Sequence, residues 1–230
     1  MPAVSTTLRA LALSAIASLS VTGCQALDDA GRAIGRADLV NDIAARLDQA
    51  LELTYSADYQ ISGGRAASIA QTQDPARSVY AWPGGMLTVT AEATTRCETG
   101  AARTVCTLLA PPETTAKPSV ALFTEAEQRG LVTPPVVVGL LTEAALDPEA
   151  VVAQSDTTLA GHPATCVDVQ QPAGDFTACV TAEGVLGSFT GELDGRPTEL
   201  TLTRYSDTVD GASFELPAGA GVVDRRAANS

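Results

Sequence analysis

Lysine, histidine and aromatic residues are scarce in this chain of 230 residues. It has one lysine, Lys117, and one histidine, His162, and aromatic residues make up 4% of it. The formal net charge is −13. Nucleic-acid binding needs clustered cations, so nucleic acid is excluded as a natural partner. A single histidine argues against Ser-His or Cys-His catalysis and against multi-histidine metal sites. Gly161 and Pro163 flank His162, which is typical of an exposed turn residue.

Motifs for chemistry are also missing. The sequence contains no G-x-S-x-G elbow, no phosphate-binding loop and no EF-hand loop. A carboxylate pair for glycoside hydrolysis stays open as an alternative, because its members need no fixed spacing in sequence. We therefore expect no enzymatic activity, no cofactor and no metal.

The chain has one extended apolar stretch, Leu11 to Val21, which is too short to span a bilayer but has the length of a secretory h-region. It ends in Val21-Thr22-Gly23-Cys24. This ending resembles the lipobox of bacterial lipoproteins, and the resemblance implies a signal peptide over residues 1–23. It also implies a diacylglyceryl group on Cys24, with the mature protein lipid-anchored to the cell membrane and facing outside the cytoplasm. The alternative is an ordinary signal peptide with a chance cysteine.

Two acyl chains make an anchor stable, whereas one gives only marginal binding. Residues 24–37 would form a lipidated tether, whose reach when extended is roughly 45 Å. The remaining sequence is enough for one domain, over residues 38–221, followed by a disordered tail over residues 222–230. The acidic charge disfavours electrostatic docking to anionic lipid, so we expect membrane contact through the anchor.

Four cysteines remain besides Cys24, and an even number suits an exported protein with disulfides. Cys97 and Cys106 enclose eight residues, and Cys166 and Cys179 enclose twelve. Both intervals are even, as directly opposed residues across an even-length hairpin loop require, so we predict these two disulfides. A four-cysteine zinc site is the alternative, but such sites bring cysteines in close pairs that are absent here.

The second cysteine pair and two turn signals predict the same strand register in the C-terminal third. Pairing Cys166 with Cys179 sets Val167 opposite Ala178. Glu183-Gly184 and Asp194-Gly195 are two-residue hairpin signals. Together they predict a four-stranded antiparallel meander and set Val180 opposite Gly187. Its buried face carries one apolar row, formed by Val167, Ala178, Phe189 and Leu200, and its other face is polar.

Upstream, apolar periodicity predicts a helix followed by strands. The helix has apolar residues every fourth position from Leu39 to Leu51. Alternating patterns predict strands over residues 55–61, 78–82, 87–97 and 105–109, and helices over residues 124–129 and 135–145. Trp82, beside Pro83-Gly84-Gly85, is interpreted as core or strand-end packing rather than a ligand platform.

That order of elements resembles the LolA-like lipoprotein carrier fold, and within it the mycobacterial LppX and LprG family. The resemblance covers residues 37–218. Its most specific pieces run in order from Leu146-Asp147-Pro148 through Gly161-His162-Pro163-Ala164-Thr165 and Ala182-Glu183-Gly184-Val185-Leu186 to Phe214-Glu215-Leu216-Pro217. It implies an α+β fold, an antiparallel half-open β-barrel wrapped around a few helices that holds acyl chains. This chain departs from the family in its two predicted disulfides and its few aromatics.

Two functions follow as hypotheses. The first is a membrane-anchored carrier of lipid or another hydrophobic ligand, and the second is a tethered partner-binding or envelope-structural module without a ligand cavity. A cavity of several hundred Å³ would favour the carrier, and a closed core the module. The candidate cavity residues are Val167, Ala178, Val180, Phe189, Leu200 and Leu202.

Overall fold

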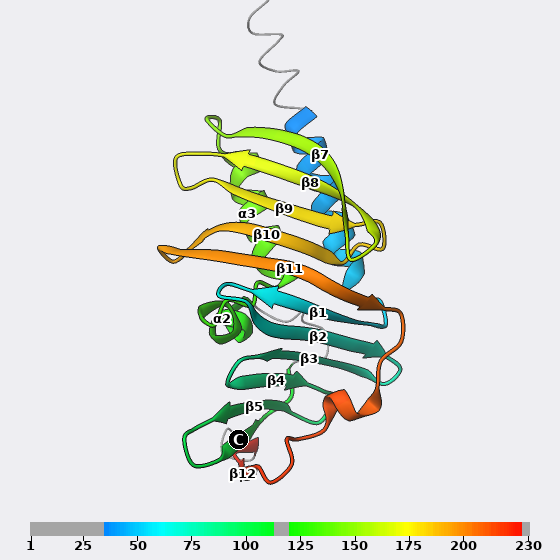
Figure 1. The fold of residues 1–230 in the computed structure, drawn as a ribbon, viewed down its shortest axis with the longest axis vertical. Coiled ribbons are helices and arrows are strands. Elements are labelled where there is room, and N and C mark those ends of the chain that lie inside the picture. Colours follow the sequence, from blue (N-terminus) through cyan, green and yellow to red (C-terminus); the bar gives the residue numbers. More distant parts are fainter. Residues whose placement is uncertain (1–34, 113–119, 227–230) are drawn as a thin grey trace, which may run out of the picture.

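Twelve strands form one sheet that does not close on itself in the computed structural model, which describes residues 35–112 and 120–226 (Figure 1). Across the sheet the order is β12-β6-β5-β4-β3-β2-β1-β11-β10-β9-β8-β7, so β12 and β7 are the edges, and no described residue pairs with their outer sides. The neighbours are antiparallel except β12 and β6. The strands are β1 Tyr55–Ile61, β2 Arg65–Gln73, β3 Ala76–Trp82, β4 Gly85–Val89, β5 Thr94–Thr99, β6 Thr104–Leu109, β7 Val151–Leu159, β8 His162–Gln170, β9 Phe176–Thr181, β10 Leu186–Leu193, β11 Arg196–Ser206 and β12 Gly221–Asp224.

Three helices cover one face of this sheet, as Figure 1 shows. They are α1 over residues 35–50, α2 (Val120–Gln128) and α3 (Pro134–Leu146). The chain starts the sheet in its middle at β1 and builds outward to β6. It then crosses the covered face through α2 and α3 to the opposite edge and returns from β7 to β11, which pairs with β1. The expected open, mainly antiparallel sheet on helices is confirmed.

The predicted N-terminal helix is confirmed, with its buried side rotated slightly from the expected stripe. Val40, Ile43, Leu47 and Ala50 are buried against the sheet, whereas Leu39 is half-buried. Leu51 lies just after the last helical turn. A spacing of four drifts around a helix with 3.6 residues per turn, so a mixed 3 and 4 spacing forms the contact.

Strand β2 was not expected from the sequence, because a polar residue stands at one of its inward positions. Gln71 is 3% exposed. Its Nε2 donates to the carbonyl oxygens of Ala50 at 2.6 Å and Leu53 at 2.7 Å, at the end of α1. Helix ends leave carbonyl groups without intrahelical partners, and a buried amide satisfies them here. This polar residue therefore serves the packing of α1 on the sheet.

The strand predicted over residues 87–97 is two strands, β4 and β5, joined by a tight turn. The hydroxyl of Thr90 accepts hydrogen bonds from the backbone N–H groups of Glu92 and Ala93, at 3.2 and 3.1 Å. A threonine side chain that binds its neighbouring backbone competes with the strand ladder and favours a turn. The alternation of apolar residues continues through this turn, which is why the sequence pattern concealed it.

The meander is confirmed in its register. Val167 faces Ala178, Ala178 faces Phe189, and Phe189 faces Leu200 across β8 to β11. One prediction is wrong: Val180 lies opposite Leu186 instead of Gly187, because an irregularity between residues 186 and 188 shifts the register. The core also contains Trp82, as expected.

Both ends of the sheet differ from the sequence analysis. The polar edge strand β7 was not expected, and residues 221–224, which begin where a disordered tail was expected, form β12 beside β6. The segment before β12 includes a short 3-10 helix, Gly211–Phe214, that contacts β3 on the face opposite the helices. There the guanidinium carbon of Arg77 lies 4.2 Å from the centre of the Phe214 ring.

Candidate functional site

The six candidate cavity residues lie together on the helix-covered face, where other side chains occupy the space expected for a ligand. Each is 0–2% exposed. They belong to one cluster with Val137 and Leu141 of α3 and Phe123 of α2. Side chains with so little accessible surface border no space for even a water molecule, so in this structure they form packed core. The hydroxyl of Tyr59 adds a buried hydrogen bond to the carbonyl oxygen of Leu186 at 2.9 Å, which joins β1 to β10.

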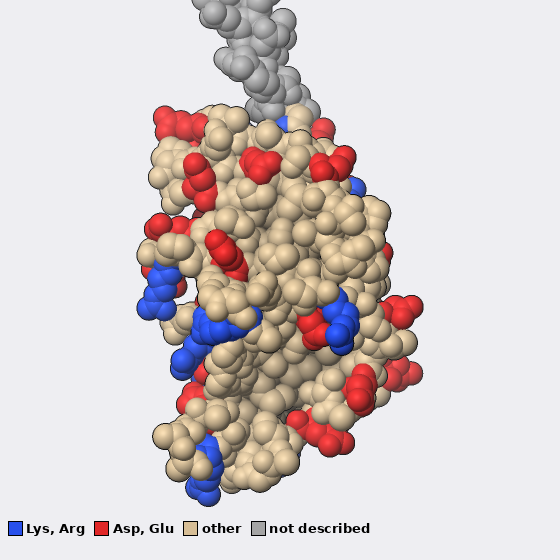
Figure 2. Space-filling model, viewed as in Figure 1, with Lys and Arg blue, Asp and Glu red and all other residues tan. Residues whose placement is uncertain are grey.

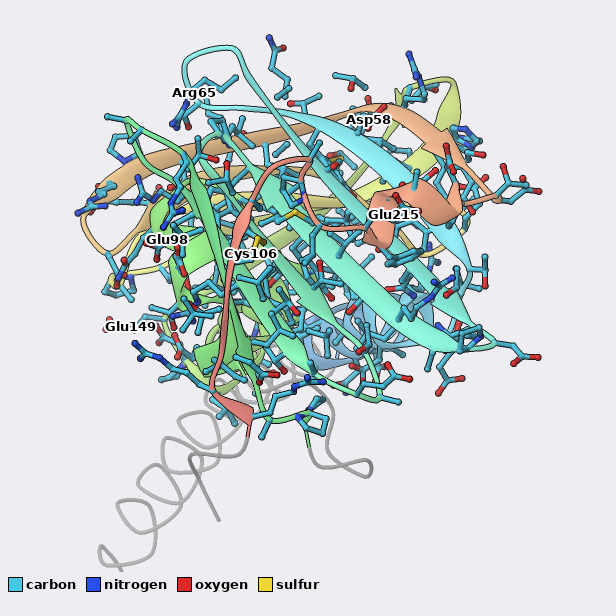
Figure 3. The ribbon with its side chains drawn as sticks, turned by 90° about the horizontal axis from the view of Figure 1, so that it is seen from below. Asp58, Arg65, Glu98, Cys106, Glu149 and Glu215 are labelled. Atoms are coloured by element: carbon cyan, nitrogen blue, oxygen red, sulfur yellow. A yellow bond between two sulfur atoms is a disulfide. The ribbon has the colours of Figure 1, made fainter. Side chains whose placement is uncertain are left out.

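Both predicted disulfides are present, on the sheet face opposite the helices. Cys97 and Cys106 join β5 to β6 with 4.0 Å between their Cα atoms, and Cys166 and Cys179 join β8 to β9 at 3.9 Å. The first is buried beside the C-terminal segment, as Figure 3 shows at Cys106. The second forms a small outer cluster with Ala164 and Leu159. Cys24, the predicted signal peptide and residues 24–34 of the predicted tether lie outside the described residues.

His162 is more enclosed than the exposed turn residue expected from the sequence. Its Nδ1 lies 2.8 Å from Glu183 Oε1, and its ring meets the edge of the Tyr205 ring with 5.0 Å between centroids. Burial opposes ionisation of Glu183, but hydrogen bonds from His162 and from its own backbone N–H outweigh that and lower the pKa. This pair clamps the β9–β10 turn against the start of β8.

A pocket of about 120 Å³ lies between the end of α2 and two turns of the sheet. Three arginines line it: Arg65 after the β1–β2 turn, Arg129 after α2, and Arg196 at the start of β11. Figure 2 shows Arg side chains at the level of α2, on a face where Asp and Glu side chains are scattered, and Figure 3 shows Arg65 at one end of its strand. Glu127 and Asp194 also line the pocket. Burial, and then the charge of Asp194, raise the pKa of Glu127.

A second pocket of about 430 Å³ lies across β3, β2, β1 and β11. Its lining includes small residues that point away from the helices, among them Ala66, Ser68 and Ala81. None of the six candidate cavity residues lines either pocket. Within the described ranges, no group of three or more His, Cys, Asp or Glu residues could hold a metal ion.

The free edge at β7 is the other exposed feature. Seven of its nine residues are exposed, and it pairs with β8 over nine residues without a bulge. Close to its start, Leu146 is 79% and Val151 61% exposed. Arg36, in the first described turn of α1, donates from Nη1 to the carbonyl oxygen of Ala150 at 2.6 Å. The beginning of α1 is therefore fixed beside the beginning of β7.

Comparisons with known proteins give distant structural likenesses. A structure of MucB matches at a TM-score of 0.48 and 12% identity over 78% of this chain and 63% of that one. MucB in complex with MucA(peri) matches at 0.43 and 15%, over 80% and 61%. An uncharacterized conserved protein from Thermus thermophilus matches at 0.42 and 11%, over 80% and 98%. This chain thus spans less than two thirds of the two MucB chains, and likenesses at this level assign no family.

No protein-family model matches the sequence, and neither does any curated protein. No helix in the described segments is long and apolar enough to cross a bilayer.

Proposed function

We propose that this chain is a membrane-anchored, extracytoplasmic protein-binding module whose free edge strand β7 accepts an extended segment of a partner protein. The role is non-enzymatic, and the anchor is a diacylglyceryl group on Cys24. The observation that carries the proposal is the unpaired nine-residue edge of the sheet at β7. The LolA-like family membership is part of the same proposal, supported by the order of its elements.

Free edges of this length are normally blunted, because their unpaired N–H and C=O groups attract other strands. Strand β7 has no proline, no lysine and a single charged residue, Asp156. Its pairing with β8 is continuous and contains no bulge. An incoming strand would gain backbone hydrogen bonds along this edge, with side chains on alternate faces setting specificity. The opposite edge, β12, is four residues long and offers far fewer bonds.

The packed core supports surface binding over ligand storage. Val167, Phe189 and Leu200 are each 0% exposed, so the helices already cover the apolar row of the meander. A ligand in that position would have to displace side chains packed at the density of a protein interior. A partner at the sheet edge needs no such rearrangement.

The experiment places a photo-crosslinking amino acid at Ala153 or Thr157 of β7 in the full chain, expressed in a host that lipidates it. Thr201 of β11, exposed within the body of the sheet, is the control position. We expect discrete adducts with a partner protein from both β7 positions and none from Thr201. Adducts of the chain with itself would assign the edge to a second copy instead. Equal labelling from all three positions, or none, would overturn the proposal.

A charge test complements the crosslinking. The double variant Ala153→Lys with Thr157→Lys places lysines on the edge, the means by which natural proteins protect such strands. Because both earlier crosslinking positions are now lysine, the photo-crosslinking amino acid is placed at Gln154 of β7. We expect the two lysines to remove the adduct formed from Gln154 and to leave the thermal unfolding midpoint within a few degrees. Thr201→Lys should leave the adduct unchanged. An adduct that survives the edge lysines would exclude strand addition.

A lipid carrier is the second candidate, and one observation favours it: α3 has apolar side chains beyond those that it buries fully. Val136, Val137, Leu141 and Ala144 face the core, while Val138, Leu140 and Ala145 are only partly buried and Leu146 is exposed. An acyl chain that took the place of α3 on the sheet would restore part of the apolar burial that the sheet loses. Movement of α3 would then open the apolar row to acyl chains.

The carrier is tested by extracting the natively purified protein for mass spectrometry. The diacylglyceryl anchor stays covalently bound, so any further lipid recovered in near-stoichiometric amount would support a carrier. A lipid-free protein that takes up no acyl probe would exclude it. Ala178→Trp separates the two functions, because Ala178 is 0% exposed in the core. In a module it overpacks the core and lowers the free energy of unfolding by roughly 1–3 kcal/mol. In a carrier it should in addition abolish lipid uptake.

A further inference from the structure

We propose that the pocket lined by Arg65, Arg129 and Arg196 is an anion site that takes a phosphate group, either a free phosphate compound or a lipid headgroup. Its volume of about 120 Å³ suits one tetrahedral oxyanion with bound water. The three arginines come from three separate elements, and such convergence suits a tetrahedral anion with oxygens in several directions better than a planar carboxylate.

Most N–H groups of the three arginine side chains have no hydrogen-bond partner among the described residues. Arg65 donates from Nε to the carbonyl oxygen of Ser62 at 3.1 Å and from Nη2 to that of Arg129 at 3.4 Å, which orients its side chain. It forms no ion pair with a described residue. Neither Arg129 nor Arg196 has a side-chain hydrogen bond or ion pair with a described residue. Three arginines without an ion pair among the described residues line one pocket, in a chain of net charge −13.

The two carboxylates at the pocket lower its formal charge, and three arginines against two carboxylates leave it at +1. Neither Glu127 nor Asp194 forms an ion pair with these arginines. Glu127 takes up a proton more readily than an ordinary glutamate because of burial and the neighbouring charge of Asp194. A bound anion would raise that tendency further, so binding and protonation of Glu127 should favour each other.

The position of the pocket bears on the source of the phosphate. Strand β11 is four strand spacings from β7, or roughly 19 Å at the usual separation of strands. If the tether holds the β7 end near the membrane, headgroups of the anchoring bilayer lie below the pocket. The geometry therefore favours a soluble phosphate compound, or a lipid that has left the bilayer.

The test is calorimetric titration of the full lipidated chain in non-ionic detergent, with glycerol phosphate in chloride buffer. Arg196→Gln and Arg129→Gln should each weaken binding about tenfold, the usual effect of one charge-assisted hydrogen bond. Arg204→Gln is the matched control: the same strand, 80% exposed and outside the pocket. Glu127→Gln should tighten binding at neutral pH and reduce its dependence on pH.

Mixed micelles containing phosphatidylglycerol, compared with phosphatidylcholine alone, form the lipid arm. Binding of glycerol phosphate with no preference among micelles assigns a soluble ligand. A preference for phosphatidylglycerol that Arg196→Gln removes assigns a headgroup. No binding of either probe, or equal loss in Arg204→Gln, would overturn the site. This outcome is separate from the β7 crosslinks, which do not involve the pocket.

Discussion

Arg36 Nη1 donates to the carbonyl oxygen of Ala150 at 2.6 Å, across 114 positions of sequence. The bond joins the first described turn of α1 to the residue that precedes β7. Residue 35 follows Cys24 by eleven positions, so an anchor at Cys24 would hold the β7 edge close to the membrane. The other edge, β12, lies eleven strand spacings away, or roughly 50 Å. The sheet would then extend away from the membrane as a ladder, with the arginine pocket part-way along it.

The anchor is tested by Cys24→Ser. We expect the wild-type protein to leave membranes only with detergent and to carry the mass of the lipid on residue 24. The variant should accumulate as an uncleaved precursor without that mass, because the thiol is the group acylated in lipoproteins. A wild-type product that is soluble and cut at another bond would exclude the lipoprotein proposal.

The disulfides give a prediction about covalent connectivity and stability. Peptide mapping without reduction should join Cys97 to Cys106 and Cys166 to Cys179. Replacing either pair with alanine should lower the free energy of unfolding by at most about 3 kcal/mol, since both loops are short. The far-UV circular dichroism spectrum should not change. A link between Cys97 and Cys166 would contradict the strand register.

Gly184 and Gly195 have similar backbone conformations but different surroundings, so alanine substitutions at the two positions can be compared. Both have positive φ, +90° and +73°, but a Cβ at Gly184 would lie 2.8 Å from the carbonyl oxygen of Arg46 in α1, whereas Gly195 faces open space. Gly195→Ala should cost about 1 kcal/mol, the left-handed backbone alone. Gly184→Ala should cost about 2–3 kcal/mol, because α1 must also shift. Denaturant unfolding of both variants measures the difference, and equal costs would show that α1 yields freely.

Glu183 predicts how stability depends on pH. Its pKa in the folded protein is lowered from 4.5, because hydrogen bonds from His162 and its neighbours outweigh burial. Its contribution is therefore complete above its unfolded pKa and disappears as the pH falls through the lower folded value. Glu183→Gln should reduce the unfolding free energy at pH 6, and the difference from wild type should shrink below about pH 4.

Glu192→Gln, exposed on the neighbouring strand β10, is the control for that series and should show little difference at any pH. Chemical denaturation between pH 3 and pH 7 gives both curves. A Glu183→Gln deficit that is constant over this range would mean that the carboxylate contributes through packing instead of charge.

Local sequence patterns determined the meander, because period-two alternation and two-residue turns leave one register that buries every apolar residue. The Asp194-Gly195 turn has positive φ at both residues, as such a turn requires. The two disulfides could be predicted on similar grounds, because an even interval places the two cysteines of a pair directly opposite each other across a hairpin. Where a residue departed from the pattern, as Gly187 does at the irregularity in β10, the prediction was off by one position.

Tertiary structure alone decided β2, β7 and the arginine pocket. Gln71 points inward in β2 because it binds carbonyl groups of α1, a partner about twenty positions away that no local pattern contains. Seven of the nine residues of β7 are exposed, so the strand has no fully buried face for alternation to mark. Arg65, Arg129 and Arg196 are scattered in sequence, and only the crossing of α2 over the sheet brings them together. Sequence patterns record which side of a strand or helix is buried, whereas contacts between distant segments depend on how those buried sides are packed against one another.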